Sequence, residues 1–322
     1  MKVIRALRWA MLRQDPRNYQ ILFLSLFLLL GIGTRDWTLR PDLILVVMVT
    51  CLLTQWVAVS IWSNPKEKIL DSLTKKQTCN TELESNLASS PKLLSLKSAM
   101  ITALGLSLLL RADHYTTMML AGSLAILSKF LFQVERKHFF NPANFGIIAA
   151  LIFTGDAWVS PGQWGDDGWY ALLFAGTGGL VLKRVGRWDT TATFLGAYAL
   201  LEAIRNIWLG WTWDVYCHRL MSGSLLLFAL FMITDPRSIP NARISRLLWA
   251  GSIAVVTFIL RNQFFVSTAV FWALFALSPL SVLLDYIWSA PRFSWLSPPP
   301  NVDRCSVENK AADTESEQYS KV

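Results

Sequence analysis

The sequence predicts an all-α fold, a polytopic membrane helix bundle with about ten transmembrane helices. Apolar residues make up 53% of the 322 residues and charged residues only 16%, whereas soluble domains carry about a quarter charged residues. The charges stand in short clusters between apolar runs of roughly 15 to 23 residues, the length that crosses a bilayer. Basic residues also alternate from loop to loop, as a membrane topology requires.

Ten apolar runs follow one another along the chain. They are residues 19–33, 41–63, 95–110, 115–132, 142–154, 168–182, 189–209, 220–234, 244–260 and 264–287. A hydrocarbon core of about 30 Å needs about 20 helical residues. The third, fifth, sixth and eighth runs are well below that length, so we expect short or broken helices among the ten.

The basic residues predict the orientation. With the N-terminus placed inside, the inner segments hold 24 of the 30 Lys and Arg residues, and the outer segments hold six. Those six are Arg35, Arg40, Arg111, Arg205, Arg219 and Arg261. Inner loops of membrane proteins carry such an excess, so we expect both termini to face the cytoplasm from the cell inner (plasma) membrane. The same bias explains the net charge of +8 without nucleic acid as a partner.

The chain divides into a membrane domain and a tail. We expect residues 1–290 to form the membrane domain, with a polar cytoplasmic loop at 64–94, and residues 291–322 to be disordered because they are charged and rich in Ser and Pro. No cleavage site follows the first apolar run, so we expect it to remain as the first helix. The four cysteines are scattered without C-x-x-C spacing, and neither a disulfide framework nor a metal site is expected.

The chain resembles itself at an offset of about 125 residues. The R-K-H-F-F segment at 136–140 returns as R-N-Q-F-F at 261–265, and the run opened by S-A-M at 98–100 corresponds to the run opened by S-G-S at 222–224. This predicts two repeats of five spans, about 19–154 and 168–287, with opposite orientation in the membrane. Inverted repeats form binding or conduction sites where the copies meet. Chance similarity between apolar runs is the alternative.

The segment F-F-N-P-A-N that precedes the fifth run is the first candidate binding site. Pro142 suits the first turn of a helix, Asn141 is placed to cap it, and Asn144 follows one turn later. Free N–H groups at such a helix start bind anions or carbonyl groups. We expect Phe139 or Phe140 to pack on a ligand ring. An ordinary capped helix is the alternative.

The second candidate lies where the eighth run ends, at Thr234 and Asp235. Because Pro236 follows, the helix is expected to stop there. A carboxylate at a helix C-terminus is electrostatically unfavourable, which predicts a partner for Asp235: a cation, a backbone donor or a ligand N–H. Solvation at the membrane interface is the alternative. The topology places Asp235 and Asn144 on the same side of the membrane, and we expect the two segments to meet.

Glu202 and Arg205 are candidates for an ion pathway. They lie three residues apart in the seventh run and share a helix face. Ionisable residues within a membrane span are costly and often functional. An ion pair near the outer surface is the alternative.

These motifs resemble those of the RnfD/NqrB family, the membrane subunits of the Rnf electron transport complex and of the sodium-translocating NADH:quinone oxidoreductase. The N-P-A-N-F-G segment at 141–146 is similar to the family's F-N-P-A element. The S-G-S run that ends in T-D-P at 234–236 resembles its S-G-(A/S) helix, and L-D-Y at 284–286 is also similar. The resemblance covers roughly residues 95–290.

The resemblance implies a membrane subunit that transfers electrons in a redox-driven ion translocase, carries a flavin (FMN or riboflavin), and works with other membrane subunits and with iron–sulfur or flavin subunits. Family members link FMN to a Thr in an S-G-A-T stretch between spans five and six. Residues 155–168 contain no Thr, and S-G-A-T does not occur in the chain. We therefore expect a non-covalent flavin and no catalytic residue. The alternatives are an inverted-repeat transporter or channel, or an accessory membrane protein of a biosynthetic pathway.

Overall fold

The structure is a computed structural model that describes residues 15–34, 40–62, 91–161 and 169–293. Residues 1–291 form one compact unit, to which all the elements below belong; residues 292–322 form a second unit. Most of the predicted loop at 64–94 and of the predicted tail at 291–322 lies outside the described residues. The last four residues of that loop form the start of a helix, so the loop prediction is wrong at its C-terminal end.

The described part of the chain is mostly helical. In chain order its helices are α2 (Pro16–Thr34), α3 (Pro41–Trp62), α5 (Pro91–Leu109), α6 (Tyr115–Leu131), α7 (Pro142–Phe153), α8 (Trp169–Val185), α9 (Trp188–Trp208), α10 (Trp213–Leu220), α11 (Gly223–Leu227), the π-helical η1 (Phe228–Met232), α12 (Arg243–Asn262), α13 (Ala269–Leu277) and α14 (Leu280–Ile287). Every predicted apolar run falls on one of these helices or on a consecutive pair of them. The sequence pattern therefore located the helical segments correctly.

Two of the described helices, α3 and α12, are each long and apolar enough to cross a membrane. Helices α13 and α14 meet the same criteria as a pair, but they are bent by 46° at the break between them. Pro279 lies in that break, and proline cannot donate the backbone hydrogen bond of a continuous helix. Shorter apolar helices accompany them, among them α6, α7 and the α11–η1 segment. The chain is thus a helical membrane protein, while the number of ten spans stays a prediction.

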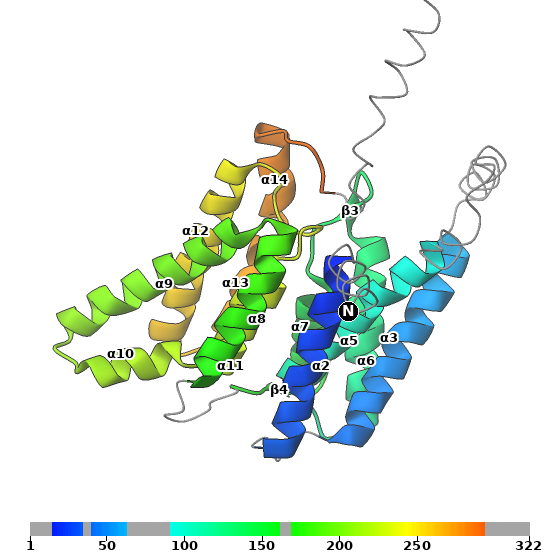
Figure 1. The fold of residues 1–322 in the computed structure, drawn as a ribbon, viewed down its shortest axis with the longest axis horizontal. Coiled ribbons are helices and arrows are strands. Elements are labelled where there is room, and N and C mark those ends of the chain that lie inside the picture. Colours follow the sequence, from blue (N-terminus) through cyan, green and yellow to red (C-terminus); the bar gives the residue numbers. More distant parts are fainter. Residues whose placement is uncertain (1–14, 35–39, 63–90, 162–168, 294–322) are drawn as a thin grey trace, which may run out of the picture. The chain divides into compact units, whose positions relative to one another are not determined.

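The helices pack in two groups that have the same pairing pattern. In the first group α2 packs on α5, α3 packs on α5 and α6, and α6 packs on α7. In the second group α8 packs on η1, α9 packs on η1 and α12, and α12 packs on α13. Figure 1 shows the first group in blue to teal and the second in green to orange. The groups touch where α2 meets α8 and where α7 meets α13.

Short elements lie at the centre of this packing. Helix α7 has 12 residues, α11 and η1 have five each, and most of their side chains are buried. Phe228 of η1 and Phe271 of α13 are almost fully buried and meet edge to face with ring centroids 5.8 Å apart. The short fifth and eighth runs therefore form inner helices: the start of α7 and the end of η1 are buried, whereas Phe153 at the end of α7 is exposed.

Three features were not predicted from the sequence. Helix α10 is a short amphipathic helix in a segment expected to be an outer loop. Strands β1 (Leu110–Arg111) and β4 (Trp158–Val159) form one antiparallel pair, and β2 (Gln133–Val134) and β3 (Lys137–His138) form another. The β2–β3 hairpin turns through Glu135 and Arg136, which both have positive φ angles. Such turns usually carry Asn or Gly, so the residue types give no signal for this hairpin.

Gly146 allows α7 to approach α6 closely. A Cβ atom at this position would lie 2.6 Å from the carbonyl oxygen of Ala121 and 2.8 Å from Cβ of Ala125. Backbone atoms of a neighbouring helix cannot rotate away as a side chain can. Small residues at such contacts are typical of membrane helix packing, and this explains the glycine in the N-P-A-N-F-G segment.

The substitution Gly146→Ala should therefore destabilise the protein. Overpacking of a close contact costs about 1–3 kcal/mol, and we expect the free energy of unfolding in detergent to fall by about this amount. Gly176→Ala is the matched control, because a Cβ atom there meets nothing within 4 Å. It should change stability little or raise it, since alanine is the better helix former. Equal stability of the two variants would disprove the close-contact explanation.

Candidate functional site

The side chain of Asn141 joins two helix ends. It is the N-cap of α7, where its Oδ1 accepts a hydrogen bond from the backbone N–H of Asn144 at 3.0 Å. Its Nδ2 donates to the carbonyl oxygen of Met232, at the end of η1, also at 3.0 Å. Pro142 occupies the first turn of α7, where a missing N–H costs little. The 141–146 segment therefore contacts the chain at Met232, two residues before the 234–237 segment.

Asn144 points into the interior at the same place, which we call the junction: the start of α7 beside the end of η1. Only 1% of its surface is exposed, and its Nδ2 donates to the carbonyl oxygen of Phe271 in α13 at 3.1 Å. Its Oδ1 has no hydrogen-bond partner among the described residues. A buried acceptor left unpaired costs about 1–3 kcal/mol, and Oδ1 of Asn206 and Oε1 of Gln55 likewise lack a partner among the described residues.

Thr234 and Asp235 continue the junction after η1. The Thr234 hydroxyl donates to the carbonyl oxygen of Leu230 at 2.9 Å, which closes the last helical turn. The Asp235 carboxylate accepts a hydrogen bond from the backbone N–H of Arg237 at 3.2 Å, and its Oδ2 lies 3.5 Å from Nε2 of His138. The predicted partner of Asp235 is thus a histidine on strand β3, together with a backbone donor.

The charge states of this pair follow from its surroundings. Burial acts to raise the pKa of Asp235, but the contact with His138 and the nearby Arg237 outweigh it, and the pKa lies below its ordinary value. Burial lowers the pKa of His138 in spite of the neighbouring carboxylate. Both shifts favour an ionised carboxylate beside a neutral imidazole near pH 7.

Phe139 and Phe140 belong to an aromatic cluster at the start of α7. Phe140 is buried, and its ring lies against Phe275 with centroids 5.0 Å apart and against Phe139 with centroids 4.8 Å apart. Phe139 is only half-buried. Of the two, Phe139 is the ring with free surface for a ligand, whereas Phe140 supports it from the protein side.

Glu202 is buried in a separate network, and its partner differs from the sequence expectation. Its Oε2 accepts a hydrogen bond from Arg219 at 3.1 Å, and its Oε1 accepts from Tyr198 and from Asn262, each at 2.9 Å. No ion pair between Glu202 and Arg205 is present in this described region. The guanidinium of Arg205 lies over the ring of Trp211, 4.6 Å from its centroid. The ion pair considered for Glu202 and Arg205 is therefore wrong, because α10 returns Arg219 to the carboxylate.

Further ties to strand β3 were missed from the sequence. The Lys137 ammonium donates to the Asp285 carboxylate of α14 and to the carbonyl oxygen of Ile239. Asn241 donates to the same carboxylate from its backbone N–H at 2.7 Å. Asp285 belongs to the L-D-Y motif at 284–286, so this motif fastens α14 to strand β3. The sequence marks Lys137 only as one basic residue among those of an inner loop.

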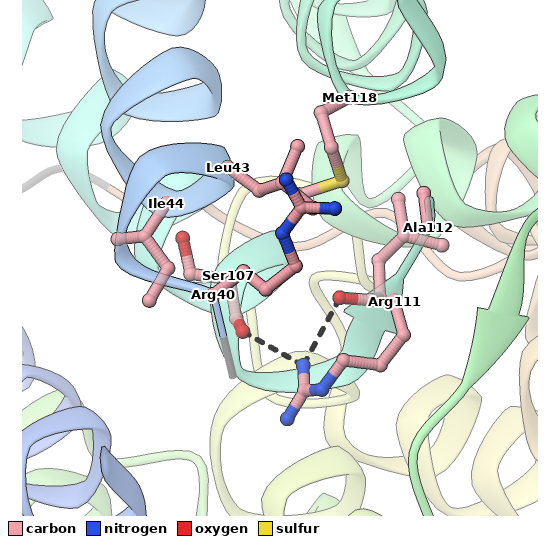
Figure 2. A pocket seen from close by; sticks show the side chains of 8 residues that line it. Arg40, Leu43, Ile44, Ser107, Arg111, Ala112 and Met118 are labelled. Carbon is pink, nitrogen blue, oxygen red and sulfur yellow. Dashed lines mark hydrogen bonds between the residues drawn. The ribbon is translucent and has the colours of Figure 1, made fainter. Parts of the chain in front are cut away.

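The cavity in Figure 2 lies elsewhere, at the start of α3 and α6. Arg40, Leu43, Arg111 and Met118 are among its lining residues. The Arg111 guanidinium donates back to the carbonyl oxygens of Ser107 and Leu110 at 2.9 and 3.0 Å, as the dashed lines show. None of the predicted site residues lines this cavity. Among the described residues, no three His, Cys, Asp or Glu side chains are grouped to hold a metal ion.

The family model of NQR2, RnfD and RnfE matches residues 44–294, which include the whole junction. The chain belongs to this family. It is a divergent member, because its curated relatives are 26–31% identical to it over the matched residues.

Curated members of the same family match part of this chain at low sequence identity. The RnfD subunit of the ion-translocating oxidoreductase complex of Halorhodospira halophila is 27% identical over 126 residues, 39% of this chain and 35% of the relative. The protein of the same description from Vibrio vulnificus (strain YJ016) is 31% identical over 149 residues, 45% of this chain and 39% of the relative. The one from Actinobacillus pleuropneumoniae serotype 5b is 27% identical over 119 residues. The chain spans about a third of the length of the first of these relatives.

The Glu202 network yields a stability prediction. Glu202→Gln removes the charge that binds Arg219, and hydrogen bonds to charged groups contribute about 1.5–3 kcal/mol. We expect the free energy of unfolding in detergent to fall by about 1–3 kcal/mol, less if Arg219 turns toward solvent. Arg205→Gln is the control and should cost only about 0.5–1 kcal/mol for the lost stacking on Trp211. A larger loss for Arg205→Gln than for Glu202→Gln would contradict the assignment of Arg219 as the partner.

Proposed function

We propose that the protein is a membrane subunit of a flavin-dependent electron transport complex, and that this complex couples electron transfer to ion translocation. The observation that carries the proposal is the junction of α7, η1 and α13, where Asn144 has a buried oxygen without a partner among the described residues and where Asn141 hydrogen-bonds Met232, three residues before Asp235. Family membership supports it, and the matched relatives are described as subunits of ion-translocating oxidoreductase complexes.

The side chains at the junction fit the edge of a flavin ring. An isoalloxazine ring offers carbonyl acceptors and an N–H donor on one edge. The Asn144 oxygen and the Asp235 carboxylate are acceptors for such a donor. In the first turn of α7, Pro142 has no N–H and the Asn144 N–H is bound by Asn141, which leaves the N–H of Ala143 as the donor. Phe139 has a half-buried ring that suits the face of the flavin, while Asn141, Pro142, Thr234 and Phe140 hold these groups in place. A bound flavin would accept and pass on electrons.

The flavin is proposed to be FMN or riboflavin held without a covalent bond. The support is the absence of Thr from residues 155–168, where the family's acceptor is expected. Residues 162–168 lie outside the described part of the chain. The described part of this segment is held by its neighbours, since the Asp156 carboxylate accepts hydrogen bonds from the backbone N–H groups of Asp113 and His114 at 3.1 and 3.0 Å.

The proposed architecture has ten spans in two inverted repeats of five, in the inner membrane with both termini in the cytoplasm. Its support is the matching pairing pattern of the two helix groups and the 24-to-6 distribution of basic residues. Helices α7 and α11–η1 are short and meet end to end through Asn141, as discontinuous helices do at the sites of inverted-repeat proteins. Lipid and the other membrane, iron–sulfur and flavin subunits of the complex are the proposed partners.

An inverted-repeat transporter or channel without redox chemistry is the second candidate. The observation in its favour is the buried carboxylate of Glu202, which an ion could use if Arg219 were displaced. An accessory membrane protein would need neither a flavin site at the junction nor a buried carboxylate such as that of Glu202. Flavin retained by the purified protein favours the first proposal, and ion flux in liposomes without added electron donor favours the transporter.

The substitutions Asn144→Ala and Asp235→Ala should each weaken flavin binding about 5- to 150-fold, because each removes a buried hydrogen-bonding group worth about 1–3 kcal/mol. The measurement is the flavin released on denaturation of protein purified in detergent. On a denaturing gel the protein band should show no flavin fluorescence, since the proposed flavin is not covalently linked.

Asn206→Ala is the matched control for the first variant. Asn206 is also buried, and its Oδ1 likewise has no partner among the described residues, but it lies on α9 away from the junction. This variant should be destabilised without losing flavin. Wild-type flavin content in folded Asn144→Ala and Asp235→Ala proteins would refute the proposed site, and a fluorescent band would point to covalent attachment, for example at Ser160 or Ser224.

A further inference from the structure

Three arginines lie close together where α10 turns back from the end of α9 (Figure 1). Two of them share one aromatic ring. The guanidinium of Arg205 lies over the ring of Trp211, 4.6 Å from its centroid, and the guanidinium of Arg219 lies 5.4 Å from the same centroid. Arg219 also donates to the buried Glu202 carboxylate at 3.1 Å. Both guanidinium groups are thus held beside one ring, and one of them binds a carboxylate.

The third arginine joins the group through a tyrosine. Arg261, in the last turn of α12, donates to the Tyr198 hydroxyl at 2.9 Å. That hydroxyl in turn donates to Oε1 of Glu202, whose Oε2 accepts the hydrogen bond from Arg219. Helices α9, α10 and α12 therefore each supply one arginine to what we call the arginine cluster: Arg205, Arg219 and Arg261.

The arginine cluster has more positive charge than its neighbours neutralise. Glu202 forms an ion pair with Arg219, and among the described residues no carboxylate lies within 4 Å of Arg205 or Arg261. A guanidinium has five N–H donors, but within the described part of the chain Arg205 donates no hydrogen bond and Arg261 donates one. All three side chains are half-buried, where charge without a counter-charge is costly. The cluster thus has both the excess charge and the free donors to bind an anion.

Helix dipoles explain only part of this arrangement. Arg205 and Arg261 lie in the last turns of α9 and α12, where a cation interacts favourably with the helix end. Each helix end would gain this interaction without the other arginine nearby. Because like charges repel, bringing the two ends together with Arg219 is favourable only if negative charge is present between them. Glu202 supplies a single negative charge for the three arginines.

Exposed aromatic side chains surround the arginine cluster. Trp208 at the end of α9 is 87% exposed, and Trp211 and Trp213 after it are also exposed. Phe264 and Phe265, which follow α12, are exposed as well. Helix α10 is amphipathic, and none of its residues is buried. Tryptophan gathers at the level of the lipid headgroups, and amphipathic helices lie in the same plane, so these surroundings fit a cluster at the membrane surface.

We propose that the arginine cluster binds the phosphate headgroup of an anionic phospholipid, with the exposed tryptophans against its glycerol and acyl chains. Guanidinium groups bind phosphate oxygens through paired N–H donors, and basic pockets between membrane helices bind anionic headgroups. The aromatic rim favours a lipid over an acidic side chain of another subunit. A bound headgroup would hold α10 to α9 and α12. This inference does not depend on the proposed flavin site.

The test is lipid binding by the full-length protein in a neutral detergent, followed as the rise in unfolding temperature with added lipid. The wild type should bind phosphatidylglycerol more tightly than zwitterionic phosphatidylcholine. Arg205→Gln and Arg261→Gln should each weaken phosphatidylglycerol binding about 5-fold, the contribution of one basic residue to the binding of anionic lipid. Arg40→Gln is the matched control. Arg40 is also an arginine of a predicted outer segment, but it pairs with Asp42, and its loss should leave the affinity unchanged.

Equal affinity of the wild type for the two lipids would overturn the proposal and favour an acidic partner subunit. Unchanged phosphatidylglycerol affinity in folded Arg205→Gln would also overturn it. This variant is expected to fold, because the ring of Trp211 is the contact that its guanidinium loses, and Arg261→Gln gives a second, independent test. Soluble glycerol phosphate should stabilise the wild type much less than phosphatidylglycerol at the same concentration. Equal stabilisation would assign the cluster to a soluble phosphate ester and refute the lipid site.

Discussion

The hydrogen bonds of the Asn141 side chain are the interaction on which the junction depends. One amide caps the start of α7 and binds the last carbonyl of η1. Both helices are too short to cross a membrane, and the start of α7 and the end of η1 are buried in the protein. Unpaired backbone groups are costly where water is absent, and Asn141 satisfies one at each end. The neighbouring side chains of Asn144, Thr234 and Asp235 are placed by these two helix ends.

The cost of leaving polar groups unpaired in the interior also explains the hydrogen bonding of the other buried polar side chains. Glu202 receives hydrogen bonds from three side chains, and Asp285 binds Lys137 and Asn241. These networks fasten α9 to α10 and α12, and α14 to strand β3. Some buried acceptors have no partner among the described residues, including Oδ1 of Asn144 at the junction and Oδ1 of Asn206 on α9.

Much of this organisation could be predicted from the sequence, because apolar runs, Pro142 and Pro236 fix helix positions locally. The meeting of Asn141 with the end of the eighth run followed from topology, since both segments were expected on one side of the membrane. The partners of the charged residues could not be predicted in this way. Arg219 reaches Glu202 through a chain reversal at α10, and His138 reaches Asp235 through a hairpin whose turn residues give no signal. Such contacts depend on tertiary packing, which spacing along one helix does not encode.

Asn141 ties α7 to η1 through two separate hydrogen bonds, and the stability of Asn141→Asp measures what the bond to η1 contributes. Aspartate caps a helix as well as asparagine does, so the cap of α7 is kept. The aspartate carboxylate cannot donate a hydrogen bond to the Met232 carbonyl oxygen, which is then left buried and unpaired. We expect the free energy of unfolding in detergent to fall by about 1–3 kcal/mol relative to wild type. A variant as stable as the wild type would contradict this claim.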